Sequence, residues 1–163
     1  MTSVANWTEQ HTLADAEATE AFGRALGAQL RAGDLLVLIG PLGAGKTTLT
    51  RGIGEGLGVR GPVTSPTFVL ARTHPSTVGG APLVHVDAYR LSDARELDDL
   101  DIDFAGSVVV VEWGLGLLDG VTESWLELEL QRPTTLSDAD LAADEPRTLT
   151  IRAFGPRWLN RLT

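Results

Sequence analysis

Several kinds of residue and segment are missing from this sequence, and each absence narrows what the chain can be. None of the 163 residues is a cysteine, so disulfide scaffolds, thiolate metal sites and cysteine catalysis are excluded. The longest purely apolar runs have about five residues, far short of the roughly 20 needed to span a bilayer. Residues 1–10 contain neither a basic segment nor an apolar one, so we expect no secretory signal and a cytoplasmic location.

Positive charge is also scarce. The 13 lysine and arginine residues face 22 aspartate and glutamate residues, and the formal net charge is −9. Nonspecific binding of nucleic acid needs a basic surface, so we expect no binding to DNA and contact with tRNA only through a partner protein. A hydrophobic content of 43% and a charged content of 21% are typical of an ordinary globular protein.

The most informative segment runs from Gly40 to Thr47 and fits the Walker A pattern G-x-x-x-x-G-K-[ST] at every fixed position. It follows the apolar run Leu35–Ile39, which is typical of a buried parallel strand. A stretch that can form a helix follows from Lys46. Strand, glycine loop and helix together aim backbone N–H groups at phosphate oxygens, so the segment predicts a nucleoside triphosphate with Mg²⁺ as the ligand.

Each residue type in this loop has a physical role. The glycines permit backbone conformations that a side chain would block, and they allow close approach to the phosphates. Lys46 is expected to reach the β- and γ-phosphates, and the Thr47 hydroxyl to be a Mg²⁺ ligand. Pro41 removes one backbone N–H from the loop. We expect the nucleotide to be held by Gly40, Pro41, Leu42, Gly43, Ala44, Gly45, Lys46, Thr47 and Thr48.

Three helices are expected. The first begins at Thr12, where the spacing T-x-x-D resembles a capping box, and ends at Gly33. The second covers residues 46–57, and its alternate glycines indicate a short helix packed closely against the sheet. Ser92 can cap a third, which extends to about Leu100.

The expected strands are separated by these helices and lie at residues 35–39, 67–71, 83–87, 108–112, 125–130 and 148–154. This order predicts a P-loop NTPase-like α/β/α fold of three layers, with a mixed, largely parallel sheet and antiparallel late strands. We expect one P-loop ATPase domain over residues 1–163, with a flexible N-terminus at 1–11 and a mobile connection at 132–147.

Two acidic residues end predicted strands, Asp87 after Leu83-Val84-His85-Val86 and Glu112 after four valines. Ligands of open α/β sheets bind at the carboxyl ends of the strands. One carboxylate can therefore hold Mg²⁺ while the other orients or activates a water molecule. The alternative is that one of them is an ordinary strand-end acid exposed to solvent.

Three further residues near these positions need an interpretation. Thr67 either senses Mg²⁺ or the γ-phosphate, as switch loops do, or simply begins a strand. Trp113 follows Glu112 and, by strand alternation, points to the opposite face, where core packing would explain it. His85 shares the face of Asp87 and is interpreted as structural.

Four segments together resemble one family, TsaE (also called YjeE). They are Gly40-Pro-Leu-Gly-Ala-Gly-Lys-Thr-Thr48, Ser65-Pro-Thr-Phe68, His85-Val-Asp-Ala-Tyr-Arg-Leu91 and Val111-Glu-Trp113. The resemblance covers roughly residues 12–152. It departs from the family pattern at Pro41, where an acidic residue is common, and at Gly114, where proline is frequent.

The resemblance implies a small ATPase, weak alone, that binds ATP or ADP with Mg²⁺ and acts with the TsaB–TsaD complex in threonylcarbamoyl modification of adenosine 37 of tRNAs reading ANN codons. It implies that Glu112 is a Mg²⁺ ligand, that Asp87 is catalytic and that Thr67 is switch-like. It also places Trp113 at the nucleotide site and Thr12 near the adenine.

Three alternatives remain open. A small-molecule P-loop kinase needs a lid that supplies arginines, and Arg90, Arg95 and Arg132 are scattered along the chain. A regulatory GTPase needs an N-K-x-D motif, which neither Asn6 nor Asn160 provides. A nucleotide-gated binding module without turnover is the third.

Overall fold

The structure is a computed structural model, and it describes residues 4–41, 43–61, 63, 71–88, 91, 94–113, 118, 121–132 and 146–162. The strands are β1 (Trp7–Leu13), β2 (Leu35–Ile39), β3 (Ala71–His74), β4 (Leu83–Asp87), β5 (Val108–Glu112), β6 (Trp125–Gln131) and β7 (Arg147–Phe154). The α-helices are α1 (Ala16–Gly27), α2 (Lys46–Leu57) and α3 (Ala94–Asp98), and a 3₁₀ turn, η3, covers Pro156–Trp158. None of the described helices is long and apolar enough to cross a membrane.

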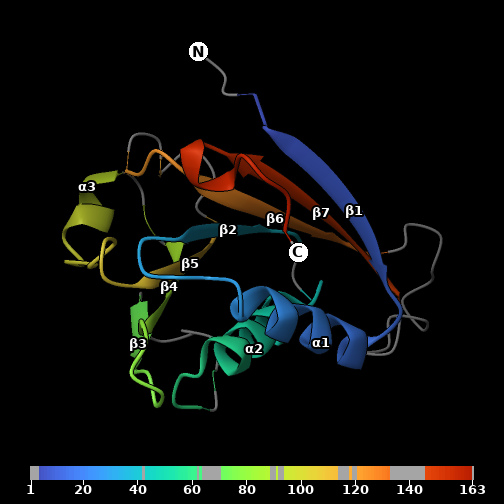
Figure 1. The fold of residues 1–163 in the computed structure, drawn as a ribbon, viewed down its shortest axis with the longest axis horizontal. Coiled ribbons are helices and arrows are strands. Elements are labelled where there is room, and N and C mark those ends of the chain that lie inside the picture. Colours follow the sequence, from blue (N-terminus) through green and yellow to red (C-terminus); the bar gives the residue numbers. More distant parts are fainter. Residues whose placement is uncertain are drawn as a thin grey trace.

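All of these strands belong to one sheet in the order β1-β7-β6-β2-β5-β4-β3 (Figure 1). The pairs β2–β6, β2–β5 and β4–β5 are parallel. The pairs β1–β7, β6–β7 and β3–β4 are antiparallel. The prediction of a mixed sheet flanked by helices is confirmed, but antiparallel pairing occurs at both edges rather than only among the late strands.

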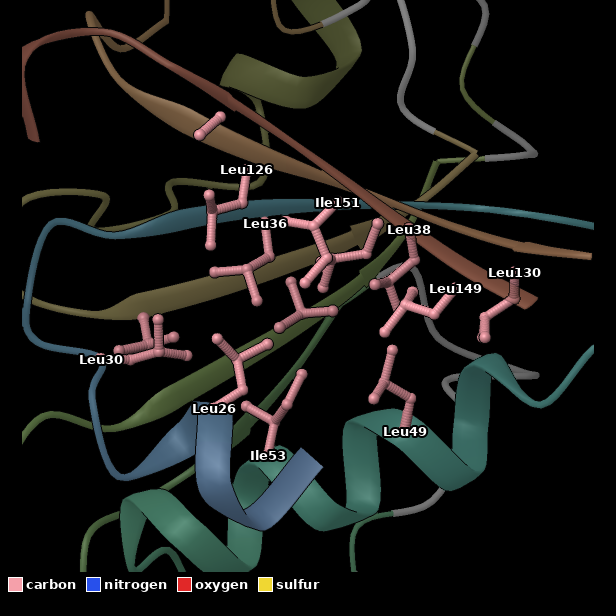
Figure 2. Packing of buried hydrophobic residues seen from close by; sticks show 14 of the residues in the cluster. Leu26, Leu30, Leu36, Leu38, Leu49, Ile53, Leu126, Leu130, Leu149 and Ile151 are labelled. Carbon is pink, nitrogen blue, oxygen red and sulfur yellow. The ribbon is translucent and has the colours of Figure 1, made fainter. Parts of the chain in front are cut away.

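Strand alternation separates two hydrophobic clusters. Leu36 and Leu38 of β2 face α1 and α2, which lie side by side on one face of the sheet (Figure 1). Figure 2 shows Leu26 of α1 and Ile53 of α2 packed beneath these strands. Leu35 and Val37 point the other way, into a second cluster that includes residues of α3. Because both faces are covered, the central strands are continuous apolar runs.

The N-terminal region differs from the prediction. Thr12 does not begin a helix but lies in β1, which pairs with β7 along its whole length. Helix α1 begins at Ala16, because Asp15 is the N-cap and its Oδ1 accepts from the Ala18 N–H at 2.8 Å. It ends at Gly27, short of Gly33. The expected flexible segment 1–11 is therefore a strand from Trp7 onward.

Helix α2 has the predicted bounds, but its glycines do not allow the close packing against the sheet that was expected. A Cβ on Gly52 would overlap the Glu20 carbonyl oxygen, and one on Gly56 would overlap the Arg24 carbonyl oxygen. The close packing of these glycines is thus against α1 rather than the sheet. Gly54 differs, because its added Cβ would meet the side chains of Val63 and Val59 and, at 3.5 Å, that of Leu83 in β4. We call the four glycines at this contact the glycine seam: Gly23, Gly27, Gly52 and Gly56.

The other predicted strands are confirmed within a residue or are only partly described. The strands at 35–39, 83–87 and 108–112 match β2, β4 and β5, and the two late strands are each one residue longer than predicted. Of the strand expected at 67–71, only Ala71 is described, and it begins β3. Ser92 and residues 133–145 of the expected mobile connection lie outside the described residues.

Candidate nucleotide-binding site

The glycine loop connects β2 to α2 at the carboxyl ends of the parallel strands. Gly40, Gly43 and Gly45 have φ values of 155°, 79° and 104°, a region that side chains disfavour. A Cβ on Gly40 would also lie 2.7 Å from the Leu130 carbonyl oxygen of β6. Gly45 is the N-cap of α2. The sequence therefore places glycine where the backbone must turn sharply into a helix N-terminus.

Lys46 begins α2 and is buried beneath the loop. Its Nζ donates to the Gly40 carbonyl oxygen at 2.5 Å and lies 3.7 Å from the centroid of the Trp113 ring. Burial lowers the pKa of this ammonium group, although the negative charges of Glu112 and Asp87 oppose the shift. Lys46 is also the sole lysine among the 163 residues.

Two carboxylates meet beside this ammonium group. Asp87 and Glu112 are directly paired in the β4–β5 register, and Leu38 of β2 pairs with Glu112 from the other side. Alternation turns both carboxylates toward the face that α2 covers. Glu112 is buried and Asp87 half-buried, so neither is a fully exposed strand-end acid.

His85 of the neighbouring strand β4 contacts the Glu112 carboxylate. Its Nε2 lies 2.8 Å from Glu112 Oε2, and its side chain is fully buried. Nδ1 has no hydrogen-bond partner among the described residues, so the shared proton is best placed on Nε2, donating to Glu112. From the sequence, His85 was interpreted as structural, and this contact with Glu112 was not predicted. The signal in the sequence is that His85 shares a strand face with Asp87, at the end of the strand that was expected beside Glu112.

Trp113 does not follow the strand alternation that was expected of it. Strand β5 ends at Glu112, and Trp113 has a φ of 63°, a rare value for a bulky residue. This turn brings the ring over Lys46 instead of into the opposite core, and leaves 42% of the residue exposed. Such strain persists where the surroundings determine it, often at functional sites.

Two arginines at the outside of the loop were not predicted to belong to this site. Arg147 donates from Nε to the Ala44 carbonyl at 3.1 Å and from Nη2 to the Gly43 carbonyl at 3.3 Å. A Cβ on Gly43 would lie 3.3 Å from Arg132 Nη1. No motif signals these contacts, because they depend on β6 being placed beside β2 and β7 beside β6.

The remaining predicted residues are placed as follows. Thr47 and Thr48 lie half-buried in the first turn of α2. Thr12 is exposed in β1 and pairs with Thr148, next to Arg147, so its expected position near the adenine stays a prediction. Leu42 and Thr67 lie outside the described residues.

The donor set fits Mg²⁺ in the manner of phosphate-loop proteins. No cluster of three or more metal-ligating side chains occurs in the described ranges, and none is needed. Mg²⁺ of this class is bound by one or two protein oxygens together with phosphates and waters. The Thr47 hydroxyl and the Glu112 carboxylate, one oxygen of which contacts His85, would supply such ligands.

The mixed sheet, the left-handed glycine loop and the buried lysine at a helix N-terminus define a P-loop NTPase-like α/β protein. A family model described as "Threonylcarbamoyl adenosine biosynthesis protein TsaE" matches residues 13–138. This match covers most of the sequence, and the chain belongs to the TsaE family.

Individual relatives agree with this assignment. A protein of Streptomyces coelicolor named tRNA threonylcarbamoyladenosine biosynthesis protein TsaE is 58% identical over 139 residues, covering 83% of this chain and 90% of that protein. The Bacillus subtilis protein of the same name is 37% identical over 143 residues, covering 87% and 84%. The crystal structure of Bacillus subtilis YdiB superposes with a TM-score of 0.72 at 31% identity, covering 93% and 89% of the two chains.

Proposed function

We propose that this chain binds and hydrolyses MgATP in support of threonylcarbamoyl modification of adenosine 37 in tRNAs that read ANN codons. It would act in the cytoplasm with the TsaB–TsaD complex. Family membership and the names of the relatives support the pathway. The net charge of −9 supports a role in which tRNA is contacted through partners.

The observation that carries the proposed activity is the convergence of Lys46, Asp87 and Glu112 at the carboxyl ends of β2, β4 and β5. Lys46 would exchange its contacts with Gly40 and Trp113 for phosphate oxygens. A triphosphate places negative charge beside a cation that burial has partly stripped of water, and such an interaction is strong.

The two carboxylates have separate roles in this proposal. Thr47 and Glu112 would hold Mg²⁺, which neutralises charge on the phosphates when bound. Asp87, half-buried and next to Glu112, would accept a hydrogen bond from the attacking water and orient it toward the γ-phosphorus. Trp113 would cover the site and limit access of other water molecules.

Phosphate release from MgATP tests the proposal, with the purified chain alone and with its cognate TsaB–TsaD complex. We expect slow turnover alone and stimulation by the complex, both abolished in Lys46→Ala. We also expect Asp87→Asn to keep MgATP binding while losing turnover. Turnover unaffected by the complex would contradict the pathway, and transfer of phosphate to a small acceptor would favour a kinase instead.

A further inference from the structure

Arg147 lies against the outside of the phosphate loop, and the proposed chemistry gives it no role. Its guanidinium group donates to two consecutive loop carbonyls, those of Gly43 and Ala44, at 3.3 and 3.1 Å. Only 7% of the residue is exposed. Burial of a charged group is unfavourable unless hydrogen bonds compensate it, so the loop carbonyls and Arg147 stabilise each other.

The hydrogen bond to the Ala44 carbonyl determines which way the Gly45 N–H points, whereas the Ala44 N–H, which follows the Gly43 carbonyl, donates within the loop to the Pro41 carbonyl oxygen at 3.1 Å. A carbonyl and the N–H that follows it belong to one planar trans unit and point in opposite directions. Holding the Ala44 carbonyl from outside therefore turns the Gly45 N–H inward, toward the side where α2 begins. Successive N–H groups arranged in this way form the concave sites that bind phosphate.

The loop has a particular need for such external support. Its three left-handed glycines have unusually free backbones, and ordering them on binding would cost conformational entropy. Arg147 is the first residue of β7, where it pairs with Leu13 of β1. The guanidinium group thus links the loop to a rigid antiparallel region of the sheet.

We infer that Arg147 is a positioning residue that holds the phosphate loop in its nucleotide-binding shape, an inference that rests on the proposed nucleotide site. Arginine suits the position because its planar fork contacts both carbonyls at once, whereas lysine offers a single ammonium point. The residue reaches the loop from outside and contacts backbone oxygens, so its effect is on affinity rather than on the chemical step.

Arg152 provides a matched control on the same strand. It pairs with Glu129 at 2.7 Å and with Glu127 at 3.8 Å. Alternation places it on the face opposite to Arg147, which shares the face of the buried Leu149 and Ile151. Arg152→Met therefore removes an arginine and its ion pairs from β7 without removing a contact to the phosphate loop.

The test measures MgADP affinity by calorimetry and amide hydrogen exchange of the loop, for the wild type and for Arg147→Met, Arg147→Lys and Arg152→Met. We expect about tenfold weaker binding in Arg147→Met, an intermediate loss in Arg147→Lys and less than about a twofold change in Arg152→Met. Without nucleotide, exchange at residues 44–46 should accelerate in Arg147→Met while β6 and β7 stay protected. Turnover at saturating MgATP should change by less than about threefold.

Unchanged MgADP affinity and loop exchange in Arg147→Met would overturn the inference. If that variant does not fold, Arg147→Lys decides: weaker binding supports the positioning role, and wild-type affinity with wild-type exchange refutes it. If the wild type itself fails to bind MgADP, the proposed nucleotide site is wrong. The exchange comparison then still shows whether Arg147 orders the loop.

Discussion

The phosphate loop and the glycine seam both depend on glycine, but for different physical reasons. In the loop, Gly40, Gly43 and Gly45 adopt left-handed backbone conformations, so what matters is their freedom in φ. The seam glycines lie inside regular helices, where a Cβ would collide with carbonyl oxygens of the neighbouring helix. There the requirement is the small size of glycine.

This difference shows that the glycines of the loop and those of the seam serve different functions, although the two groups are adjacent. The seam allows α1 to pack closely on α2, and the two helices together cover one face of the sheet. The loop provides a surface of backbone N–H groups. Substitution in the seam should therefore reduce stability and substitution in the loop should reduce nucleotide affinity.

The largest effect is expected from Gly52→Val in the seam. The new side chain would overlap the Glu20 carbonyl oxygen, so the helices must separate, and the free energy of unfolding should fall by about 3 kcal/mol. Urea denaturation measures this loss. MgADP affinity of the folded fraction should stay within about threefold of the wild type, because the loop is unchanged. A stable variant would show that the helices adapt without cost.

The next largest effect is expected from Gly43→Val in the loop. A β-branched residue at a φ of 79° is strained, and its Cβ would crowd Arg132 Nη1 at 3.3 Å. MgADP affinity should fall by about 100-fold, while the free energy of unfolding falls by only about 1–2 kcal/mol. A stability loss equal to that of Gly52→Val, together with normal affinity, would reverse the comparison.

A third prediction concerns the charge that the loop buries. Lysine labelled with ¹³C reports on Lys46 alone, because the chain has no other lysine. Titration by NMR should show a pKa below the ordinary value of 10.5, owing to burial. MgADP should raise the pKa of Lys46, because phosphates favour the charged form. A pKa at or above the ordinary value would mean that Asp87 and Glu112 outweigh the effect of burial.

The lowered pKa of Lys46 also predicts the direction in which stability changes with pH. Between the folded pKa of Lys46 and the ordinary value of 10.5, the unfolded chain binds more protons than the folded one. The free energy of unfolding should therefore rise with pH across that window. The rise attributable to this group should be absent in Lys46→Met. The loop thus retains a charge that opposes folding at neutral pH, whereas the seam serves stability alone.

Much of the core could be predicted from the sequence. The continuous apolar runs at β2 and β5 and the Walker A spacing identify the central strands, the loop and the start of α2. The same patterns place Asp87 and Glu112 at neighbouring strand ends, because parallel strands end at one edge of a sheet. These features are local, and their register follows from hydrophobic alternation.

The parts that were mispredicted depend on contacts distant in sequence. Thr12 resembles a helix cap until β1 is seen to pair with β7, more than a hundred positions along the chain. Trp113 leaves the strand alternation with a φ of 63°, and its ring lies over Lys46, which is distant in sequence. Arg147 reaches the phosphate loop only because β6 lies beside β2 and β7 beside β6. Local propensity contains none of this information.

The smallest effects should come from two neighbouring glycines that belong to neither group. Gly79 has a φ of 77° and nothing within 4 Å of an added Cβ, whereas Gly80 lacks a positive φ and meets only Ser76 Oγ, at 3.7 Å. Gly80→Ala should raise the free energy of unfolding by about 0.5 kcal/mol, because alanine reduces the entropy of the unfolded chain. Gly79→Ala should lower it by about 1 kcal/mol through backbone strain alone.

Neither variant introduces a close contact, and only Gly79→Ala introduces backbone strain. Together they measure how much stability a positive φ costs without a steric clash, which is the reference for comparing the loop with the seam. Thermal and urea denaturation measure both changes, and MgADP affinity should stay at the wild-type value in each. If Gly80→Ala instead lost more than about 1 kcal/mol, neither φ nor contact would account for the loss. The division of this chain's glycines into those required for their backbone freedom and those required for their size would then be incomplete.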